Sequence, residues 1–143
     1  MIARGEALLR RAHGFGRPGR YQYEAAIQST HCARAQGGHV DWLALRKLHR
    51  ALLRRAPSLG AAVALAVVDG QLDGPDAGLR ALDAITDPMI GRFQPAWTAR
   101  AHLLTQANRP AAAAYRKAID LTTDASVKEY LRRRLATVMK EQR

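Results

Sequence analysis

The sequence has a single cysteine and no long apolar run, which argues against a disulfide-stabilised protein and against a membrane-spanning one. Cys32 is the only cysteine among 143 residues, so the chain cannot form an internal disulfide. No apolar stretch approaches the roughly 20 residues that a membrane-spanning helix needs. Residues 1–14 lack the apolar core and the small-residue cleavage site of a secretory signal. We therefore expect a cytoplasmic protein without a membrane partner.

Alternating β-branched stretches are also absent, whereas Ala, Leu and Arg, which favour helices, dominate the sequence. Glycine and proline recur between the apolar-periodic segments and mark turns. The pattern predicts an all-α fold of about eight helices. We expect a single helical domain over residues 1–143, with N-terminal helices in 1–56 and helical hairpins plus a C-terminal capping helix in 57–143.

The first three helices are expected over residues 2–12, over 21–36 and from Asp41 onward. The segment GFGRPG separates the first two, and Gly37-Gly38 ends the second. Asp41 is the expected N-cap of the third helix. Spacing on that helix predicts one apolar face, made of Trp42, Leu45, Leu48, Leu52 and Leu53.

Further helices are expected beyond residue 57. Ser58 is the expected cap of a helix whose residues 61–68 are apolar on every face, which predicts a buried core helix ending at Gly70. The last helix is expected to begin with a capping box from Ser126 to Glu129. Proline-containing pairs are expected to open the intervening helices: Gly74-Pro75, Asp87-Pro88 and Arg109-Pro110. The expected core includes Val63, Leu65, Val67, Leu79, Leu82, Leu103, Tyr115, Ile119 and Leu131, and Tyr130 is also expected to point inward.

Two segments repeat at a period typical of stacked helical hairpins. Pro75 and Pro110 are about 35 residues apart, close to the roughly 34-residue period of tetratricopeptide repeats. Residues 58–84 and 89–121 are therefore interpreted as two successive helical hairpins. Two copies alone do not establish a repeat array, because such arrays usually need about three units and a cap.

Residues 13–35 raise two functional hypotheses, a nucleic-acid grip and a metal site. GRPGR is a single arginine-glycine unit followed by the helical stretch YQYEAAI, which favours a loop between helices over a nucleic-acid grip. His31 and Cys32 have no second ligand three or four residues away, which favours packed side chains over a metal site. Since no metal-ligand or cofactor motif is present, we expect no metal and no cofactor.

Catalysis has equally little support in the sequence. The histidines fall in no motif that would pair one of them with a nucleophile and an acid. Asp69, Asp73, Asp76 and Asp83 cluster at turns and helix ends, where capping explains them. Phosphate-binding and zinc-protease motifs are absent. We therefore expect no enzyme, no catalytic residue and no small-molecule substrate.

Charge is the strongest compositional signal, with a net charge of +11. Basic residues concentrate in 1–55 and 91–143, whereas residues 56–90 are acidic and apolar. Arginine runs end at Arg55 and begin at Arg132, but no aromatic or amide group accompanies them for base readout. We expect a protein partner that carries acidic residues around an apolar anchor. The candidate contacts to this partner are Arg46, Arg50, Arg132 and Arg133.

Six segments resemble, in the same order, the C-terminal region of bacterial extracytoplasmic-function sigma factors with a tetratricopeptide-like extension. They are IARGEALL, GRPGRYQYEAAIQSTHCARA, VDWLALRKLHRALLRRAPS, GPDAGLRALD, ARAHLLTQANRPAAAAYRKAI and EYLRRRLA. The resemblance implies a regulatory domain that contacts the sigma domains of the same polypeptide and core RNA polymerase. It implies that promoter DNA is bound only through upstream sigma domains absent from this chain, which would then be a fragment or the product of a truncated gene.

The chain departs from that family at two places. After APS the family usually has a proline and then an Asn-Arg pair, where this chain has Leu59 and Ala64-Leu65. The loop after QANR is also about two residues short of the usual repeat turn. The expected fold is unaffected, because apolar replacements on the helix expected after Ser58 only deepen its burial. A second function class is also open, a free-standing basic helical protein that binds nucleic acid nonspecifically.

Overall fold

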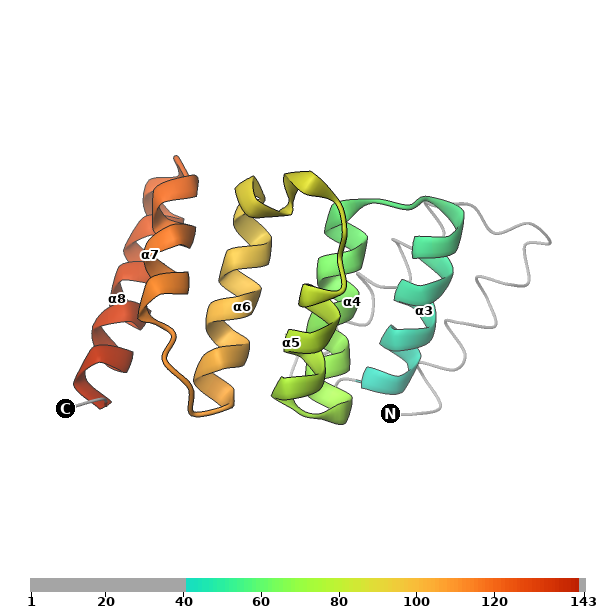
Figure 1. Cartoon of the computed structure of the whole chain (residues 1–143), viewed down its shortest axis with the longest axis horizontal. Helices are drawn as coiled ribbons and strands as arrows, with labels where there is room; N and C mark the ends of the chain where they lie inside the picture. The colour runs from blue at the N-terminus through green and yellow to red at the C-terminus, as the bar shows by residue number, and fades with distance from the viewer. Residues whose placement is uncertain (1–40, 142–143) are drawn as a thin grey trace. The chain divides into compact units, whose positions relative to one another are not determined.

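The computed structural model describes residues 41–141, and over this range the backbone forms helices and no strand (Figure 1). The all-α prediction is confirmed for this part of the chain, which contains six α-helices and one short 3-10 helix. The helices expected over 2–12 and 21–36, with His31 and Cys32, lie outside the described residues. The elements are α3 (Trp42–Arg55), α4 (Leu59–Asp73), α5 (Pro75–Asp83), η1 (Pro88–Arg92), α6 (Gln94–Gln106), α7 (Ala112–Leu121) and α8 (Ala125–Glu141).

The chain divides into two compact units, Met1–Val68 and Asp69–Arg143, and the division falls within α4. The first unit contains α3 and most of α4. The second unit contains the last turn of α4 and all the later helices. The single helical domain expected over residues 1–143 stays a prediction.

In the first unit, α3 begins where the sequence predicted. The Asp41 carboxylate accepts a hydrogen bond from the Ala44 backbone N–H at 3.0 Å, which satisfies one of the free N–H groups of the first turn. Leu45, Leu48 and Leu52 are buried as expected. Trp42 and Leu53, the other two residues of the predicted apolar face, are half-buried.

The start of α4 is also as predicted, whereas its end is not. The Ser58 hydroxyl accepts a hydrogen bond from the Ala61 N–H at 3.1 Å. Val63 is buried, but Leu65 and Val67 are half-buried, so the helix is less enclosed than its composition predicted. The helix passes Gly70 and ends at Asp73.

Two glycines near this boundary have separate physical roles. At Gly70, a Cβ would lie 2.5 Å from a methyl group of Leu103, so any larger residue would force the Leu103 side chain to shift. Gly74 has φ +98°, a left-handed conformation that glycine adopts without a steric cost, and it separates α4 from α5. Gly74 therefore supplies the break that the sequence analysis assigned to Gly70.

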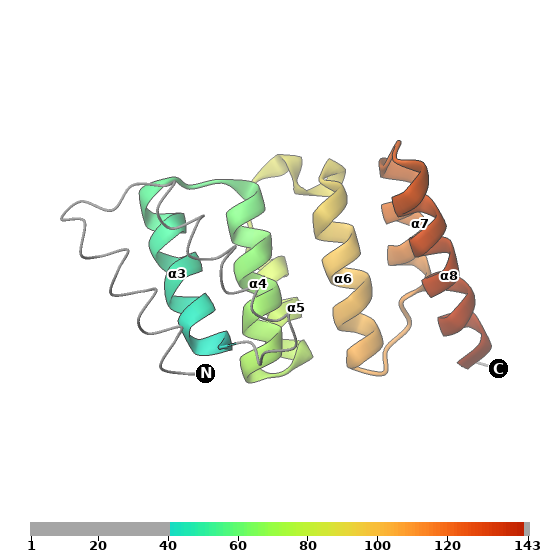
Figure 2. The same cartoon turned by 180° about the vertical axis from the view of Figure 1, so that it is seen from behind.

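In the second unit, α5 packs against α6, α6 against α7, and α7 against α8. Figures 1 and 2 show α6, α7 and α8 in this succession from opposite sides. Pro75 opens α5 and Pro88 opens η1, as the proline-containing pairs predicted. Pro110 lies two residues before α7, which begins at Ala112.

The capping box predicted from Ser126 is wrong. The Asp124 carboxylate caps α8 instead, accepting hydrogen bonds from the backbone N–H groups of Ser126 at 2.8 Å and Val127 at 3.1 Å. The helix accordingly begins at Ala125. A carboxylate at this position also interacts favourably with the positive end of the helix dipole.

Small residues and one tyrosine dominate the core of the second unit. The tyrosine, Tyr115, is fully buried together with Leu131. The buried cluster comprises Ala101, Ala111, Ala114, Tyr115, Ala118, Leu131 and Val138. The expected core residues Leu79, Leu82 and Leu103 are buried too, whereas Ile119 is half-buried. Tyr130 is 49% exposed, which corrects its expected inward position.

Candidate interaction site

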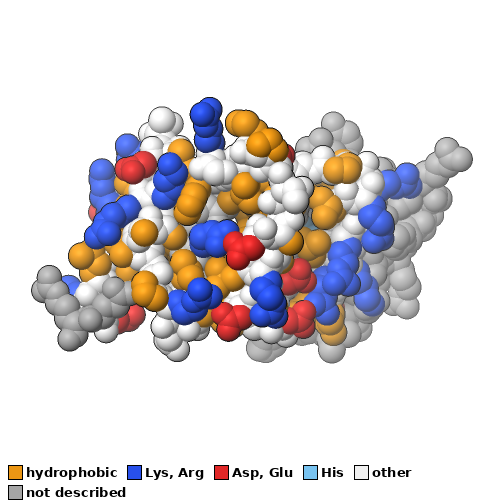
Figure 3. Space-filling model, in the orientation of Figure 1, with side chains coloured by type: hydrophobic (Ala, Val, Ile, Leu, Met, Phe, Trp, Pro, Cys, Tyr) orange, Lys and Arg blue, Asp and Glu red, His pale blue; other side chains and the backbone are white. Residues whose placement is uncertain are grey.

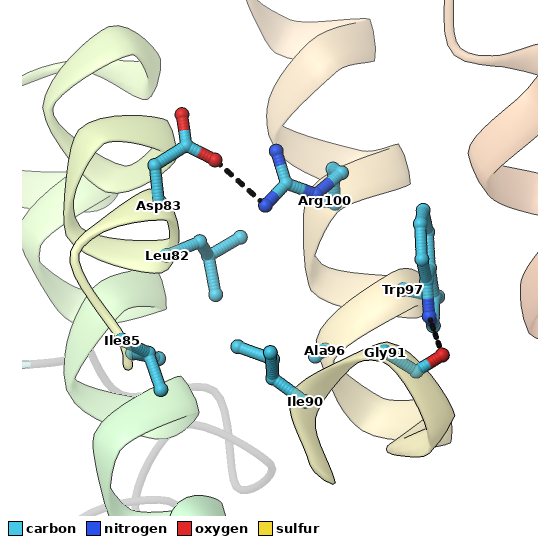
Figure 4. A pocket seen from close by; sticks show the side chains of 8 residues that line it. All are labelled: Leu82, Asp83, Ile85, Ile90, Gly91, Ala96, Trp97 and Arg100. Atoms are coloured by element: carbon cyan, nitrogen blue, oxygen red, sulfur yellow. Dashed lines mark hydrogen bonds and ion pairs between the residues drawn. The ribbon is translucent and has the colours of Figure 1, made fainter. Parts of the chain in front are cut away.

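A pocket of about 370 Å³ lies in the second unit, where α5, η1 and α6 meet (Figure 4). Its walls are mostly apolar side chains. Leu82 comes from the last turn of α5, and Ile85 follows that helix. The remaining apolar side chains are Ile90 from η1, with Ala96 and Trp97 from α6. The pocket therefore opens at a junction of three elements.

Local sequence explains the turn that shapes this pocket. The Asp87 carboxylate accepts a hydrogen bond from the Met89 N–H at 2.9 Å, and Pro88 supplies a backbone angle suited to the first helical position. This short helix holds Ile90 and Gly91 opposite the start of α6. Phe93 then takes an extended conformation and precedes α6.

Polar groups border the pocket on one side. The Arg100 guanidinium lies 2.8 Å from the Asp83 carboxylate, and the two side chains are 29% and 66% exposed. Arg100 also lies 6.0 Å from the centre of the Trp97 ring, within the range of a cation–π interaction. The Trp97 indole N–H donates a hydrogen bond to the Gly91 carbonyl at 2.9 Å. These contacts orient both Trp97 and Arg100.

The surface around the pocket carries both apolar and charged side chains. On the face of the second unit visible in Figure 3, exposed hydrophobic side chains lie between basic and acidic ones. Met89, in η1, is among the exposed large hydrophobic residues. Such a mixed surface can bind an apolar group and fix its orientation by charge.

A second polar cluster joins α6, α7 and α8. His102 lies edge-on to Tyr115 and Tyr130, with ring centroids 5.9 Å and 6.3 Å away. Burial lowers the pKa of His102, and the nearby positive charge of Arg134 lowers it further. The Tyr115 hydroxyl raises the pKa of Arg134. His102 Nε2 is buried and has no hydrogen-bond partner within residues 41–141.

The four arginines expected to contact a partner lie in different units. Arg46 is half-buried and Arg50 is exposed, both on α3. Arg132 and Arg133 are exposed on α8. Arg133 lies 3.4 Å from Glu129, one helical turn earlier. Each pair thus shares one helix, Arg46 and Arg50 on α3 and Arg132 and Arg133 on α8, and the role of all four as partner contacts stays a prediction.

Sequence reasoning missed the pocket. Trp97, Arg100 and Asp83 come from two helices that are adjacent only after folding, so no short motif joins them. A signal is present in the segment ITDPMIGRFQPAW, which runs from the end of α5 into α6 and contains several large apolar residues among two prolines and a glycine. An inter-helical loop that retains several large apolar residues is a candidate binding surface.

Within residues 41–141, no group of three or more His, Cys, Asp or Glu side chains is placed to hold a metal ion. Among the helices described, none combines the length and the apolar character needed to cross a membrane.

Comparison with known proteins identifies a relative but does not establish a function. No family model matches the chain. No solved structure matches it. An uncharacterized protein of Rhizobium meliloti (strain 1021) is 32% identical over 152 residues, an alignment that covers 100% of this chain and 36% of the relative. The chain therefore spans about a third of the length of the curated relative it matches.

Proposed function

We propose that this chain is the C-terminal interaction domain of an RNA polymerase sigma factor of the extracytoplasmic-function group. In this proposal it binds and does not catalyse, and it modulates transcription initiation through contacts with the sigma domains of the same polypeptide or with core RNA polymerase. Promoter DNA would be bound by the sigma domains. The observation that carries the proposal is the ordered resemblance of six segments across nearly the whole chain.

A tetratricopeptide-like array is part of this proposal. The second helix of such repeats carries an alanine followed, four residues later, by a large aromatic residue. Ala111, the N-cap of α7, and Tyr115 within the helix have this spacing, and both are buried. His102 of α6 lies edge-on to the Tyr115 ring, so a large side chain of the preceding helix packs on that aromatic residue. These features support stacked helical hairpins in the second unit.

Two further observations support an interaction role within a longer protein. In the Rhizobium meliloti relative, the matched region is 36% of the protein, so a region of this kind occurs there beside other sequence. On α8, Arg132 and Arg133 are exposed near the exposed Tyr130. Exposed aromatic and arginine side chains are enriched at protein interfaces.

The test is transcription in vitro with core polymerase and the longer protein that contains this region. Three forms are compared with the wild type: one without residues 1–143, one with Arg132→Glu and Arg133→Glu, and a control with Arg109→Glu. Arg109 is a suitable control because it is also an exposed arginine near a carboxylate, 3.5 Å from Asp76. We expect the deletion and the α8 reversal to change transcript yield and the control to leave it unchanged.

Circular dichroism of the variants establishes that they are folded. Wild-type transcription after deletion of the whole region would overturn the regulatory role. If the deletion alters transcription but the α8 reversal does not, the candidate contacts Arg132 and Arg133 are wrong while the regulatory role stands.

A further inference from the structure

We propose that the pocket between α5, η1 and α6 docks a protein segment that carries a large apolar side chain flanked by carboxylates. The inference concerns the pocket itself and does not depend on the sigma-factor proposal. Three properties of the described residues support it. The pocket has an apolar floor, Arg100 is oriented by an ion pair that a partner's carboxylate can replace, and Arg92 is exposed at the border.

The floor suits an apolar side chain. Leu82 and Ala96 are buried, while Ile85, Ile90 and Trp97 are half-buried and retain accessible surface. Figure 4 shows Leu82 and Ile90 pointing into the space between α5 and η1. A volume of about 370 Å³ is at the lower end of the range for binding pockets, which suits one or two large side chains of an external peptide. Covering this surface would remove apolar area from water.

Arg100 is positioned to bind a carboxylate. A guanidinium has five N–H donors, and within residues 41–141 Arg100 makes its ion pair with Asp83 and its contact with the Trp97 ring. An ion pair as exposed as this one contributes little to stability. A carboxylate from a partner can therefore share Arg100 with Asp83 or replace it at small cost, while Trp97 keeps the guanidinium oriented.

The remaining charges at the border favour an acidic segment. Arg92, next to the pocket residue Gly91, is exposed and makes no described interaction within residues 41–141. Asp83 already pairs with Arg100, and the Asp87 carboxylate accepts a hydrogen bond from the Met89 N–H. Arg92 thus has no carboxylate partner among the described residues and can bind one supplied by a docked segment. Complementary charge would increase the association rate and the apolar pocket would supply affinity.

The binding experiment uses the 143-residue chain and three fluorescein-labelled octapeptides. The probe is Glu-Glu-Asp-Leu-Phe-Asp-Glu-Glu. One control replaces Leu-Phe by Ser-Ser, and the other replaces every acidic residue by lysine. Fluorescence anisotropy measures affinity, and proton–nitrogen correlation spectra follow the indole N–H signal of Trp97. We expect the probe to bind and shift that signal, and both controls to bind at least about tenfold more weakly.

Variants test whether the pocket is the site. Arg100→Gln is expected to weaken probe binding by about three- to fivefold, and Ile90→Ser by about tenfold. Arg109→Gln, which removes another exposed arginine near an aspartate, is expected to leave affinity within about twofold. The spectra of the free variants show whether each is folded.

Several results would overturn the inference. These are absence of probe binding up to about 1 mM, equal binding of the lysine control, or unchanged affinity in folded Arg100→Gln and Ile90→Ser. Shifts confined to α8 would also overturn it. If either variant fails to fold, the spectra of the wild-type chain still decide the matter, because the Trp97 signal must move when the probe binds.

Discussion

His102 on α6 lies edge-on to Tyr115 on α7, with their ring centroids 5.9 Å apart and their planes at 64°. The contact places a titratable ring beside the fully buried tyrosine of the second unit. Burial, and then the charge of Arg134, lowers the pKa of His102 below its ordinary value of 6.5. The folded chain therefore binds a proton at His102 less readily than the unfolded chain does.

The first prediction is a loss of stability in acid. Above pH 6.5 His102 is mostly neutral in both states and the folded state carries no penalty. As the pH falls from 6.5 toward the lower folded pKa, the unfolded state takes up the proton first, so the free energy of unfolding decreases. His102→Phe should reduce this decrease. Urea unfolding followed by circular dichroism at pH 8 and at pH 5.5 measures it, and an equal decrease in both proteins would contradict the assignment.

The second prediction separates the ring of Tyr115 from its hydroxyl. Tyr115→Ala removes a fully buried ring and should reduce the free energy of unfolding by roughly 3–5 kcal/mol. Tyr115→Phe should cost only about 0.5–1.5 kcal/mol, because the hydroxyl lies 3.5 Å from the Thr105 hydroxyl, at the limit of a hydrogen bond. Chemical denaturation of both variants tests this order. Equal losses would mean that the hydroxyl, and not the ring, stabilises the cluster.

The third prediction concerns the corrected cap of α8. Asp124→Ala should destabilise by about 0.5–2 kcal/mol, since its carboxylate accepts hydrogen bonds from Ser126 and Val127. Ser126→Ala is the matched control and should have little effect, because Ser126 lies within the helix. Thermal unfolding compares the two variants. A larger loss for Ser126→Ala would restore the capping box predicted from the sequence.

Local features were predictable from the sequence, whereas features that depend on tertiary packing were not. Asp41 and Ser58 cap their helices as expected, because a cap needs only a suitable side chain two or three residues before the N–H groups it accepts from. Gly74-Pro75 opens α5 for a similarly local reason. At α8, Asp124 and Ser126 were both suitable caps, and local pattern alone did not separate them.

Which residues are buried, and where the candidate site lies, depend on how the helices pack and could not be predicted from the sequence. Helical spacing predicted that Tyr130 and Leu131 both point inward, but only Leu131 is buried. Exposure depends on which neighbouring helix covers each position. The pocket residues Leu82, Ile90 and Trp97 come from three elements whose proximity is set by packing. Sequence reasoning therefore predicted the helical class and several helix boundaries but missed the pocket.

The fourth prediction follows from the half-buried position of Trp42. Truncating a fully buried tryptophan to alanine would reduce the free energy of unfolding by roughly 3–5 kcal/mol. Trp42→Ala should reduce it by less, because Trp42 is half-buried. Leu48→Ala provides the comparison, because Leu48 is fully buried on the same helix and its truncation should cost about 2–5 kcal/mol. Urea denaturation ranks the two variants. A larger loss for Trp42→Ala would show that the indole makes a greater contribution than its exposure indicates.

The fifth prediction addresses nucleic acid, the alternative that the net charge of +11 raises. The chain should bind any DNA duplex weakly, because its exposed arginines can contact phosphates but no base-reading group accompanies Arg132 and Arg133. The logarithm of the binding constant should fall linearly with the logarithm of salt concentration, by roughly 0.9 for each phosphate contact. Anisotropy with two unrelated labelled duplexes, over about 50–200 mM salt, measures this slope.

The α8 arginines should account for part of that slope. Arg132→Glu with Arg133→Glu removes two exposed cations from one helix, so the slope should decrease by about two. Arg109→Glu is the matched single-site control and should change it by about one at most. A protected, sequence-defined footprint would contradict nonspecific binding. An unchanged slope in the double variant would mean that other arginines bind the duplex, and the exposed face of α8 would then remain available for a protein partner.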